Sequence, residues 1–316
     1  MTTSVLVTGA GGFIGRRVVT ALQSVGYHVT ALVRKTRESN ASTVVQHDLR
    51  LPLGNLPPAN WIFHLAGAYA GAGDEELSRA DSKMADNIIS WGLKAGTKNW
   101  ILASAAEVYG DVEGTATEAT PTRPVIPYGR VKLAVERRFV ESLKSLPNSR
   151  AVILRIGEVY GSQGRLVGEL TTRLKRGFCP WPGSGRVRVS FVHVDDVAQV
   201  FLGAIQHAPT GRSIYNVADD VPVSWRDFTC GVARRLGTRS PLFLPVPLVY
   251  SYALCSTLAH RIKNQDPVLT RYALRLLMTP KVLSNARLKC ELRFRPQYPS
   301  YTEGTEEALG GLSNHT

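Results

Sequence analysis

Short apolar runs alternate with longer amphipathic stretches along the first half of the chain. In the amphipathic stretches, apolar residues recur every three or four positions, which is the period of a helix with one buried face. Strands that alternate with helices form parallel sheets with helices on both faces, so we predict an α/β fold with a doubly wound parallel sheet. The predicted strands are residues 5–8, 28–33, 61–65, 100–103 and 151–154, and the predicted helices are 12–25, 75–94 and 128–146.

The pattern becomes less regular after Gly161. Proline and glycine at 180–185 predict a loop, residues 194–206 have a helical period, and prolines at 241–247 precede an apolar stretch at 248–262. That stretch is too short to span a membrane, so we interpret it as a partly buried helix, the alternative being a helix on a membrane surface. We expect a sheet domain at 1–160, to which some later segments return, a smaller C-terminal lobe at 161–308 that mainly binds the substrate, and a disordered tail at 309–316.

Composition narrows the class of protein. With 44% hydrophobic and 20% charged residues in 316, the chain has ordinary globular usage, which excludes disorder, collagen-like repetition and a small disulfide scaffold. The four cysteines are far apart and no histidine cluster has metal-ligand spacing, so we predict no metal and expect a reducing, cytoplasmic location. Met1 leads almost directly into the first apolar run, without the regions typical of a secretory signal.

The charge balance favours an anionic partner. The formal net charge is +13, which suits a phosphate-bearing molecule. The basic stretch at 261–295 contains no aromatic stacking pattern and no nucleic-acid-binding motif. We therefore expect a small-molecule partner and do not predict binding of nucleic acid.

A glycine-rich turn follows the first predicted strand and opens the first predicted helix. Gly9 permits the tight turn, Gly12 lets the backbone approach a pyrophosphate, and Gly15 allows the helix to pack closely. The helix N-terminus then faces the anion. In this context the glycines predict dinucleotide binding on a Rossmann sheet, and Phe13 and Ile14 complete the binding segment.

The residue after the second strand indicates which cofactor is bound. An acidic side chain there would accept hydrogen bonds from the adenosine ribose, whereas this chain has Arg34, whose planar guanidinium suits a 2′-phosphate. We therefore favour NADP(H), with NAD(H) as the alternative. Further cofactor contacts are predicted at the ends of the next two strands, from Asp48, Leu49, Leu65, Ala66 and Gly67.

Tyr128 and Lys132 lie four residues apart, on one face of a predicted helix. A phenol with a pKa of about 10 is a poor base, but a nearby ammonium and the positive nicotinamide favour the phenolate. Tyr128 can then exchange a proton with a carbonyl or alcohol oxygen while hydride moves to or from the nicotinamide. The pair therefore predicts an oxidoreductase.

The order of these and several shorter motifs resembles the extended short-chain dehydrogenase/reductases, the NAD-dependent epimerase/dehydratase family. The resemblance covers roughly residues 4–304 and implies a Tyr acid/base, a Lys that also holds the nicotinamide ribose, and a homodimer through the helices at 75–94 and 128–146. We interpret Asp195 and Asp196 as caps of the helix that begins there. The shorter motifs are residues 64–67, 108–110, 154–155, 159–161, 191–198 and 215–217.

Three positions depart from the pattern of that family. Ala105 replaces its substrate-orienting Ser or Thr, and Ser104 can substitute only if the strand ends or bulges there. Glu107 remains from an acid pair of the sugar dehydratases, but its acid partner is absent, which argues against dehydration. Glu158 replaces an Asn that is common in nucleotide-sugar enzymes, so either Glu158 turns away from a diphosphate or the substrate is not a sugar nucleotide.

We predict an NADP(H)-dependent oxidoreductase that reduces a keto group on a nucleotide-linked sugar. A nucleotide-sugar epimerase and a reductase of a non-sugar ketone are the enzymatic alternatives. A cofactor-sensing binding protein is the non-enzymatic one, because Ala105 lacks a hydroxyl. The candidate catalytic residues are Tyr128, Lys132, Ser104 and Glu107.

Overall fold

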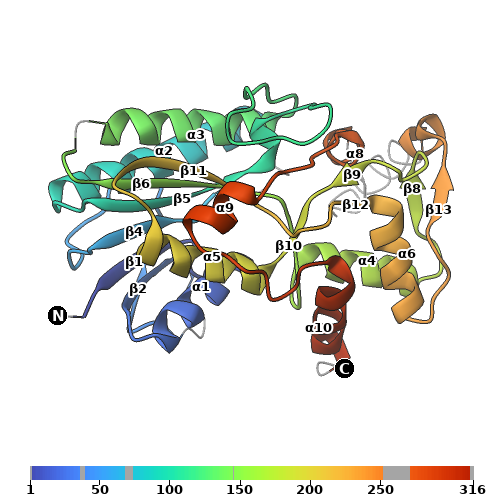
Figure 1. Ribbon diagram of the computed structural model, residues 1–316, viewed down its shortest axis with the longest axis horizontal. Helices are drawn as coiled ribbons and strands as arrows, with labels where there is room; N and C mark the ends of the chain where they lie inside the picture. Colours follow the sequence, from blue (N-terminus) through green and yellow to red (C-terminus); the bar gives the residue numbers. More distant parts are fainter. Residues whose placement is uncertain (1, 36–39, 68–73, 145, 252–270, 314–316) are drawn as a thin grey trace.

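A seven-stranded sheet forms the larger part of the protein (Figure 1). The computed structural model describes residues 2–35, 40–67, 74–144, 146–251 and 271–313. Every neighbouring pair of strands is parallel, in the order β11-β6-β5-β4-β1-β2-β3, which confirms the predicted doubly wound sheet. The strands are β1 (Ser4–Thr8), β2 (His28–Val33), β3 (Thr43–Gln46), β4 (Trp61–His64), β5 (Asn99–Ala105), β6 (Arg150–Ile156) and β11 (Gly211–Val217).

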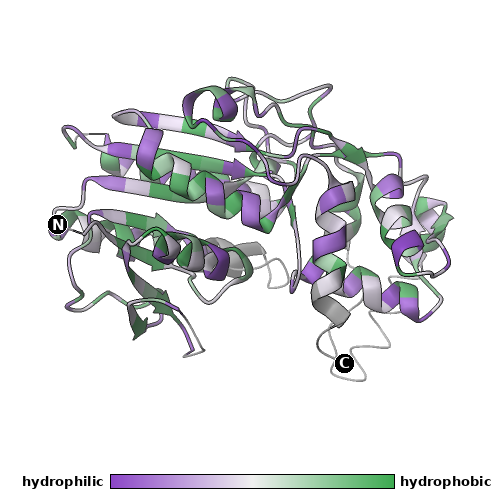
Figure 2. Cartoon of the chain, turned by 60° about the horizontal axis from the view of Figure 1, so that its bottom comes forward, coloured by the Kyte–Doolittle hydropathy of each residue, from purple (hydrophilic) through white to green (hydrophobic). Residues whose placement is uncertain are grey.

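Helices cover both faces of the sheet because alternate residues of each strand point to opposite sides. Val5 and Val7 of β1 face a core cluster shared with α1 and α5, whereas Leu6 faces the cluster shared with α2 and α3. Figure 2 shows the hydrophobic residues concentrated on the strands between these layers. The helices are α1 (Phe13–Ser24), α2 (Asp74–Lys94), α3 (Pro127–Leu143) and α5 (Val194–His207).

A smaller lobe follows the sheet and is built around aromatic side chains. The rings of Phe191 and Phe228 stack with their centroids 4.3 Å apart, and Trp225 packs edge-on against Phe191. The lobe contains short strands β7 (Glu158–Tyr160), β8 (Pro180–Pro182), β9 (Arg188–Val189), β10 (Phe191–His193), β12 (Val223–Ser224) and β13 (Leu242–Leu244). Its helices are α4 (Arg165–Lys175), α6 (Trp225–Arg235), α8 (Arg271–Met278) and α10 (Tyr301–Ser313). The remaining elements are the short helix η1 (Ala106–Val108) and α9 (Ala286–Glu291).

Two sequence expectations concern the C-terminal half. The predicted disordered tail at 309–316 is wrong as far as Ser313, because α10 continues to that residue; the remaining three residues lie outside the described part. Ala308 is fully buried and Leu309 packs against the aromatic core of the lobe, which holds the helix in place. Of the predicted helix at 248–262, residues 248–251 are helical and 252–262 lie outside the described residues. No helix within the described ranges is long and apolar enough to cross a membrane.

Candidate active site

The glycine turn joins the end of β1 to the start of α1 by close backbone contacts. Gly9 has φ of +69°, and the Gly12 N–H donates to its carbonyl oxygen at 2.9 Å. A Cβ atom on Gly15 would lie 2.2 Å from that same oxygen, and a Cβ on Gly9 would lie 2.7 Å from the Ala66 nitrogen. Gly9 and Gly15 therefore permit this closely packed turn only because they carry no side chain.

The N-terminus of α1 offers N–H groups to an anion. Its N-cap is Gly12, no side chain of the described chain caps it, and its first turn contains no acidic residue. The strand order reverses at β1, which lies between β2 and β4. In doubly wound sheets, ligands bind at this reversal point, beside the carboxyl ends of the strands. The predicted residues Leu65, Ala66 and Gly67 follow β4 at the same place.

His64 fixes the end of β4 beside the turn. Its Nδ1 lies 2.8 Å from the Thr8 hydroxyl, which also accepts a hydrogen bond from the Ala66 N–H at 3.2 Å. Burial, together with the charge of Lys132, lowers the pKa of His64 to about 3. The ring is therefore neutral at physiological pH, and it holds the strand end without adding a charge to the site.

Two guanidinium groups lie around Asp48, where the sequence predicts the adenosine part of the cofactor. Arg34 directly follows β2 and is exposed, as a contact with a cofactor phosphate requires. Arg50, which the sequence analysis missed, donates from Nε to both carboxylate oxygens of Asp48 at 3.0 Å. Its hydrogen bonds lower the pKa of Asp48 to about 2, and the charge of Arg34 contributes to the same shift. Asp48 is thus ionised and paired with Arg50.

Three other predicted cofactor residues have packing contacts. Phe13 lies against Gly164 at the start of α4, where a Cβ would come within 2.8 Å of its ring. Ile14 packs on the core cluster under α1, and Leu49 is buried between the sheet and α2. The Leu49 carbonyl accepts a hydrogen bond from the Asn87 side chain of α2 at 2.8 Å. In the described structure these three residues therefore have packing roles, and their contacts with a cofactor stay predictions.

Tyr128 and Lys132 lie together at the start of α3. Tyr128 is the second residue of the helix, and the Lys132 Nζ lies 5.6 Å from the centre of its ring. Lys132 is buried and ion-paired with Asp81 of α2, with Nζ 3.9 Å from Oδ2. A Cβ on Gly67 would lie 2.8 Å from this Nζ, so the ammonium rests against the backbone that follows β4. The helix therefore brings the Tyr–Lys pair to the cofactor end of the sheet.

The hydroxyl of Ser104 is already engaged. It donates to Glu136 of α3, and Glu136 also accepts two hydrogen bonds from Arg155, at 2.8 and 3.1 Å. Ser104, Glu136 and Arg155 are all buried. The strand continues regularly through Ala105, so the bulge that Ser104 would need is absent from this described strand. The expectation that Ser104 orients a substrate oxygen therefore loses its geometric basis.

Glu107 and Glu158 share one buried cation. The Lys281 Nζ donates to Glu107 at 2.8 Å and also contacts the carboxylate of Glu158. Burial alone would lower the pKa of Lys281, but the two carboxylates raise it above its usual value. A Cβ on Gly129 would lie 2.3 Å from the Glu107 carbonyl oxygen, which places Glu107 beside the helix turn that carries Tyr128. Sequence reasoning missed Lys281 because no local motif marks it.

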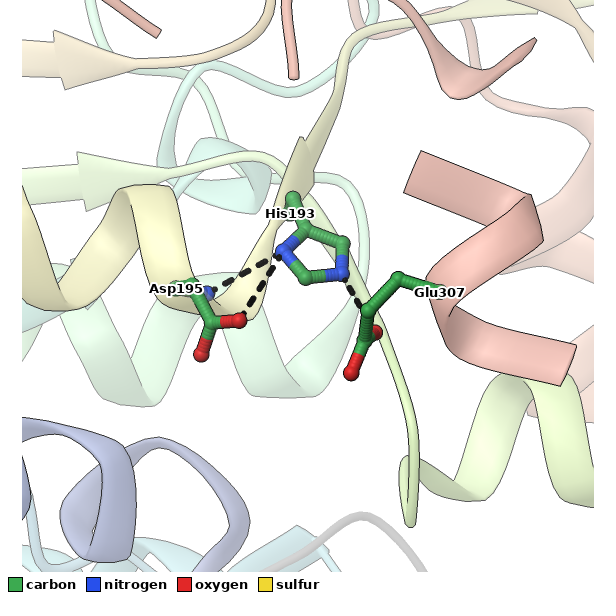
Figure 3. Close-up of side chains that lie close together, drawn as sticks. All are labelled: His193, Asp195 and Glu307. Carbon is green, nitrogen blue, oxygen red and sulfur yellow. Dashed lines mark hydrogen bonds and ion pairs between the residues drawn. The ribbon is translucent and has the colours of Figure 1, made fainter. Parts of the chain in front are cut away.

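A second polar cluster joins the start of α5 to α10 (Figure 3), and Arg17 of α1 also contacts it. His193 caps α5 by accepting from the Asp195 N–H at 3.3 Å, and its Nε2 lies 2.9 Å from Glu307. Arg17 of α1 lies 3.4 Å from Asp195 and 3.7 Å from Glu307. Although a histidine with two carboxylates has the composition of a metal site, the Arg17 guanidinium already supplies the positive charge between them.

The predicted capping role of Asp195 and Asp196 is wrong. The histidine ring occupies the cap position, and both aspartates lie in the first turn of α5. Asp195 pairs with Arg17 of α1. Asp196 accepts hydrogen bonds from the N–H groups of Gln297 and Tyr298 at 2.7 and 2.9 Å, and so anchors the segment before α10.

Comparisons with known proteins agree with this geometry. A family model described as the NAD dependent epimerase/dehydratase family matches residues 5–218. Human short-chain dehydrogenase/reductase family 42E member 1 is 27% identical over 96% of this chain and 86% of its own length. Protein YeeZ of Escherichia coli K12 is 27% identical over 66% of this chain and 72% of its own.

Solved structures share the fold across the whole chain. MoeE5 in complex with UDP-glucuronic acid and NAD superposes with a TM-score of 0.79 at 22% identity, covering 99% of this chain and 100% of that chain. UDP-glucose 4-epimerase from Thermotoga maritima, solved with UDP-glucose, gives 0.80 at 20% identity and covers 99% of each chain.

Proposed function

The chain belongs to the NAD-dependent epimerase/dehydratase family, and from that premise we propose that it uses NADPH to reduce a keto group on a nucleotide-linked sugar. The observation that carries this proposal is the Tyr128–Lys132 pair, held by Asp81 and by the backbone of Gly67 at the reversal point of the sheet. The solved relatives with bound UDP-sugars support the substrate class.

The residues at the glycine turn fit a dinucleotide. The closely packed backbone of Gly9 and Gly15 and the uncapped start of α1 would receive the pyrophosphate. Arg34 would receive a 2′-phosphate, since it is exposed directly after β2, whereas Arg50 is paired with Asp48. Lys132 would hold the nicotinamide ribose. The bound cofactor supplies the hydride.

Tyr128 gives the proton that completes the reduction. When the carbonyl carbon accepts hydride, its oxygen becomes an alkoxide, and the Tyr128 hydroxyl transfers its proton to that oxygen to form the alcohol. The Lys132 ammonium then stabilises the phenolate that remains. Asp81 keeps Lys132 in position through its ion pair, so the charge stays beside Tyr128.

A second candidate is reduction of a non-sugar ketone, and one observation favours it. Glu107 and Glu158 share the single cation of Lys281, so this trio has a net charge of −1 next to the helix turn of Tyr128. A diphosphate placed against the trio would be repelled. A neutral substrate that donates hydroxyl hydrogen bonds would be tolerated there.

The test is NADPH consumption by the purified protein with keto-sugar nucleotides and, separately, with hydrophobic ketones. We expect turnover with the keto-sugar nucleotides and at least about tenfold tighter binding of NADP+ than of NAD+, because a phosphate–guanidinium contact readily supplies the about 1.4 kcal/mol required. Arg34→Ala should remove that preference, and Lys35→Ala, at the adjacent exposed position, is the matched control.

Three results would contradict the proposal. Turnover with hydrophobic ketones alone would favour the second candidate. Tightly retained NAD+ without net NADPH consumption would favour an epimerase. Equal dissociation constants for the two cofactors would refute the role of Arg34.

A further inference from the structure

A concave pocket of about 600 Å³ lies on the smaller lobe. It is formed by the chain around β9, the turn before α6 and the starts of α6 and α10. None of the lining residues belongs to β1, the glycine turn, α1 or β2. The pocket is therefore separate from the glycine turn. Its charged and polar lining residues are Arg186, Arg188, Arg226, Ser224, Asp227 and Tyr301.

The three arginines of the pocket carry no carboxylate partner within the described chain. Arg188 donates from Nη2 to the Pro222 carbonyl at 3.1 Å, and Arg226 donates from Nε to the Ser184 carbonyl at 2.8 Å. The Arg226 guanidinium also lies 3.7 Å from the centre of the Phe243 ring. Each of the two hydrogen bonds uses one of the five N–H groups of its guanidinium, and the ring contact further orients Arg226. Arg186 is exposed.

The acidic residue of the pocket is engaged by the helix cap. The Asp227 carboxylate accepts from the Ser224 hydroxyl at 2.6 Å, and the Asp227 N–H donates back to the Ser224 oxygen at 3.1 Å. Asp227 therefore stabilises the first turn of α6. Three guanidinium groups against one carboxylate leave the lining with a net charge of +2.

We propose that this pocket binds the phosphate or diphosphate group of a soluble small molecule, a ligand site distinct from the cofactor and substrate sites of the proposed function. Guanidinium groups bind phosphate oxygens through paired N–H donors, and three of them line one pocket here. The N-terminus of α6 adds a favourable dipole on the same side. The volume of the pocket lies within the range of small-molecule pockets. A compact phosphate-bearing molecule therefore fits this site better than a membrane surface does.

The test titrates inorganic pyrophosphate into the full-length protein by calorimetry, in the presence of saturating NADP+ so that the glycine turn does not contribute. The variants are Arg186→Gln and Arg188→Gln. Arg176→Gln is the matched control, because Arg176 is exposed on the same lobe at the end of α4 and lies outside the pocket. Since all three residues are exposed, the substitutions should leave the melting temperature unchanged.

We expect the dissociation constant to rise at least about tenfold in each pocket variant and less than twofold in the control. Equal binding by all four proteins would overturn the proposal, since the anion would then be held by general surface charge. Absence of binding by the wild-type protein at millimolar pyrophosphate would also overturn it. Turnover with keto substrates is a separate measurement, so failure of this proposal is distinguishable from failure of the proposed function.

Discussion

Lys132 is held by Asp81 and by the backbone of Gly67, and these contacts give the proposed chemistry its geometry. Its ammonium lies 3.9 Å from the Asp81 carboxylate, and a Cβ on Gly67 would come within 2.8 Å of it. Lys132 is buried, so its position relative to Tyr128 is not averaged by solvent motion. A positive charge fixed one helical turn from a phenol is what proton transfer from that phenol requires.

Replacing Tyr128 by Phe should therefore abolish most of the activity while leaving the cofactor bound. The ring remains and the proton is lost, so turnover on the true substrate should fall by about 10² or more, with a nearly unchanged dissociation constant for NADPH. Tyr27→Phe, at a tyrosine between α1 and β2, is the matched control and should turn over normally. If Tyr128→Phe also turned over normally, Glu107 would be the next candidate for the proton donor.

Sequence and structure agree at the residue scale wherever a motif is local. The glycine turn and the Tyr128–Lys132 pair each lie within a few residues, so spacing alone places their members together. Lys281 could not be predicted, because its partners Glu107 and Glu158 are 174 and 123 residues away and only the tertiary fold unites them. The hydrogen bond of the Ser104 hydroxyl could not be predicted for the same reason, because its acceptor, Glu136, comes from another element.

At the scale of elements, the end of β11 is bound to β7 through one buried carboxyl. Asp219 follows β11, is 4% exposed, and accepts from the Tyr160 hydroxyl of β7 at 3.3 Å. Its other oxygen has no hydrogen-bond partner in the described structure. Burial, followed by the charge of Asp196 on α5, raises the pKa of Asp219 to about 8. The folded protein thus binds a proton there that an unfolded chain releases at a pKa of about 4.

The protein should consequently lose stability as pH rises through this window. Between pH of about 4 and about 8, the folded state holds one proton more than the unfolded state at this carboxyl. The contribution of that proton to the free energy of unfolding is therefore full at low pH and lost above pH of about 8. We expect the free energy of unfolding to fall by about 1 kcal/mol or more from pH 6 to pH 9, measured by urea denaturation. Asp219→Asn should flatten this dependence, whereas Asp111→Asn, at an exposed site, should preserve it. An unchanged slope in Asp219→Asn would show that another group titrates.

The spacing of apolar residues predicted the helices and strands better than local composition did. The strand at 28–33 has the predicted limits, and the helices at 75–94 and 194–206 differ from α2 and α5 by one residue at one end. Composition predicted disorder after Ala308, where glycine, serine and asparagine are frequent. Tertiary packing overrides that local preference, because Thr305 and Ala308 are fully buried against the lobe.

At the scale of the whole molecule, we expect a second copy to bind the outer surface of α2 and α3. The two helices pack side by side on one face of the sheet and are joined by an ion pair between Asp86 and Arg138. Family resemblance implies a four-helix interface at this surface. Small uncharged residues, Ser90 on α2 and Ala134 on α3, are exposed there and allow close approach of another pair of helices.

We therefore predict a homodimer, observable by sedimentation at micromolar concentration. Ala134→Arg places a long charged side chain in the expected interface and should shift the protein towards the monomer. Thr20→Arg introduces the same side chain at an exposed position of α1, on the other face of the sheet, and should not. A wild-type monomer at these concentrations, or equal sedimentation of both variants, would contradict the assignment of this surface.

The cluster of Arg17, His193 and Glu307 also bears on when folding can be completed during synthesis of the chain. Six of the seven strands of the sheet precede residue 157 and can begin to pair while the rest of the chain is still being made. Glu307, however, is synthesised after all seven strands and must still reach helix α1, which is synthesised before β2. A chain interrupted shortly before α10 would keep its sheet but leave His193 and the aromatic core of the lobe uncovered, and so would present a hydrophobic surface to chaperones and proteases.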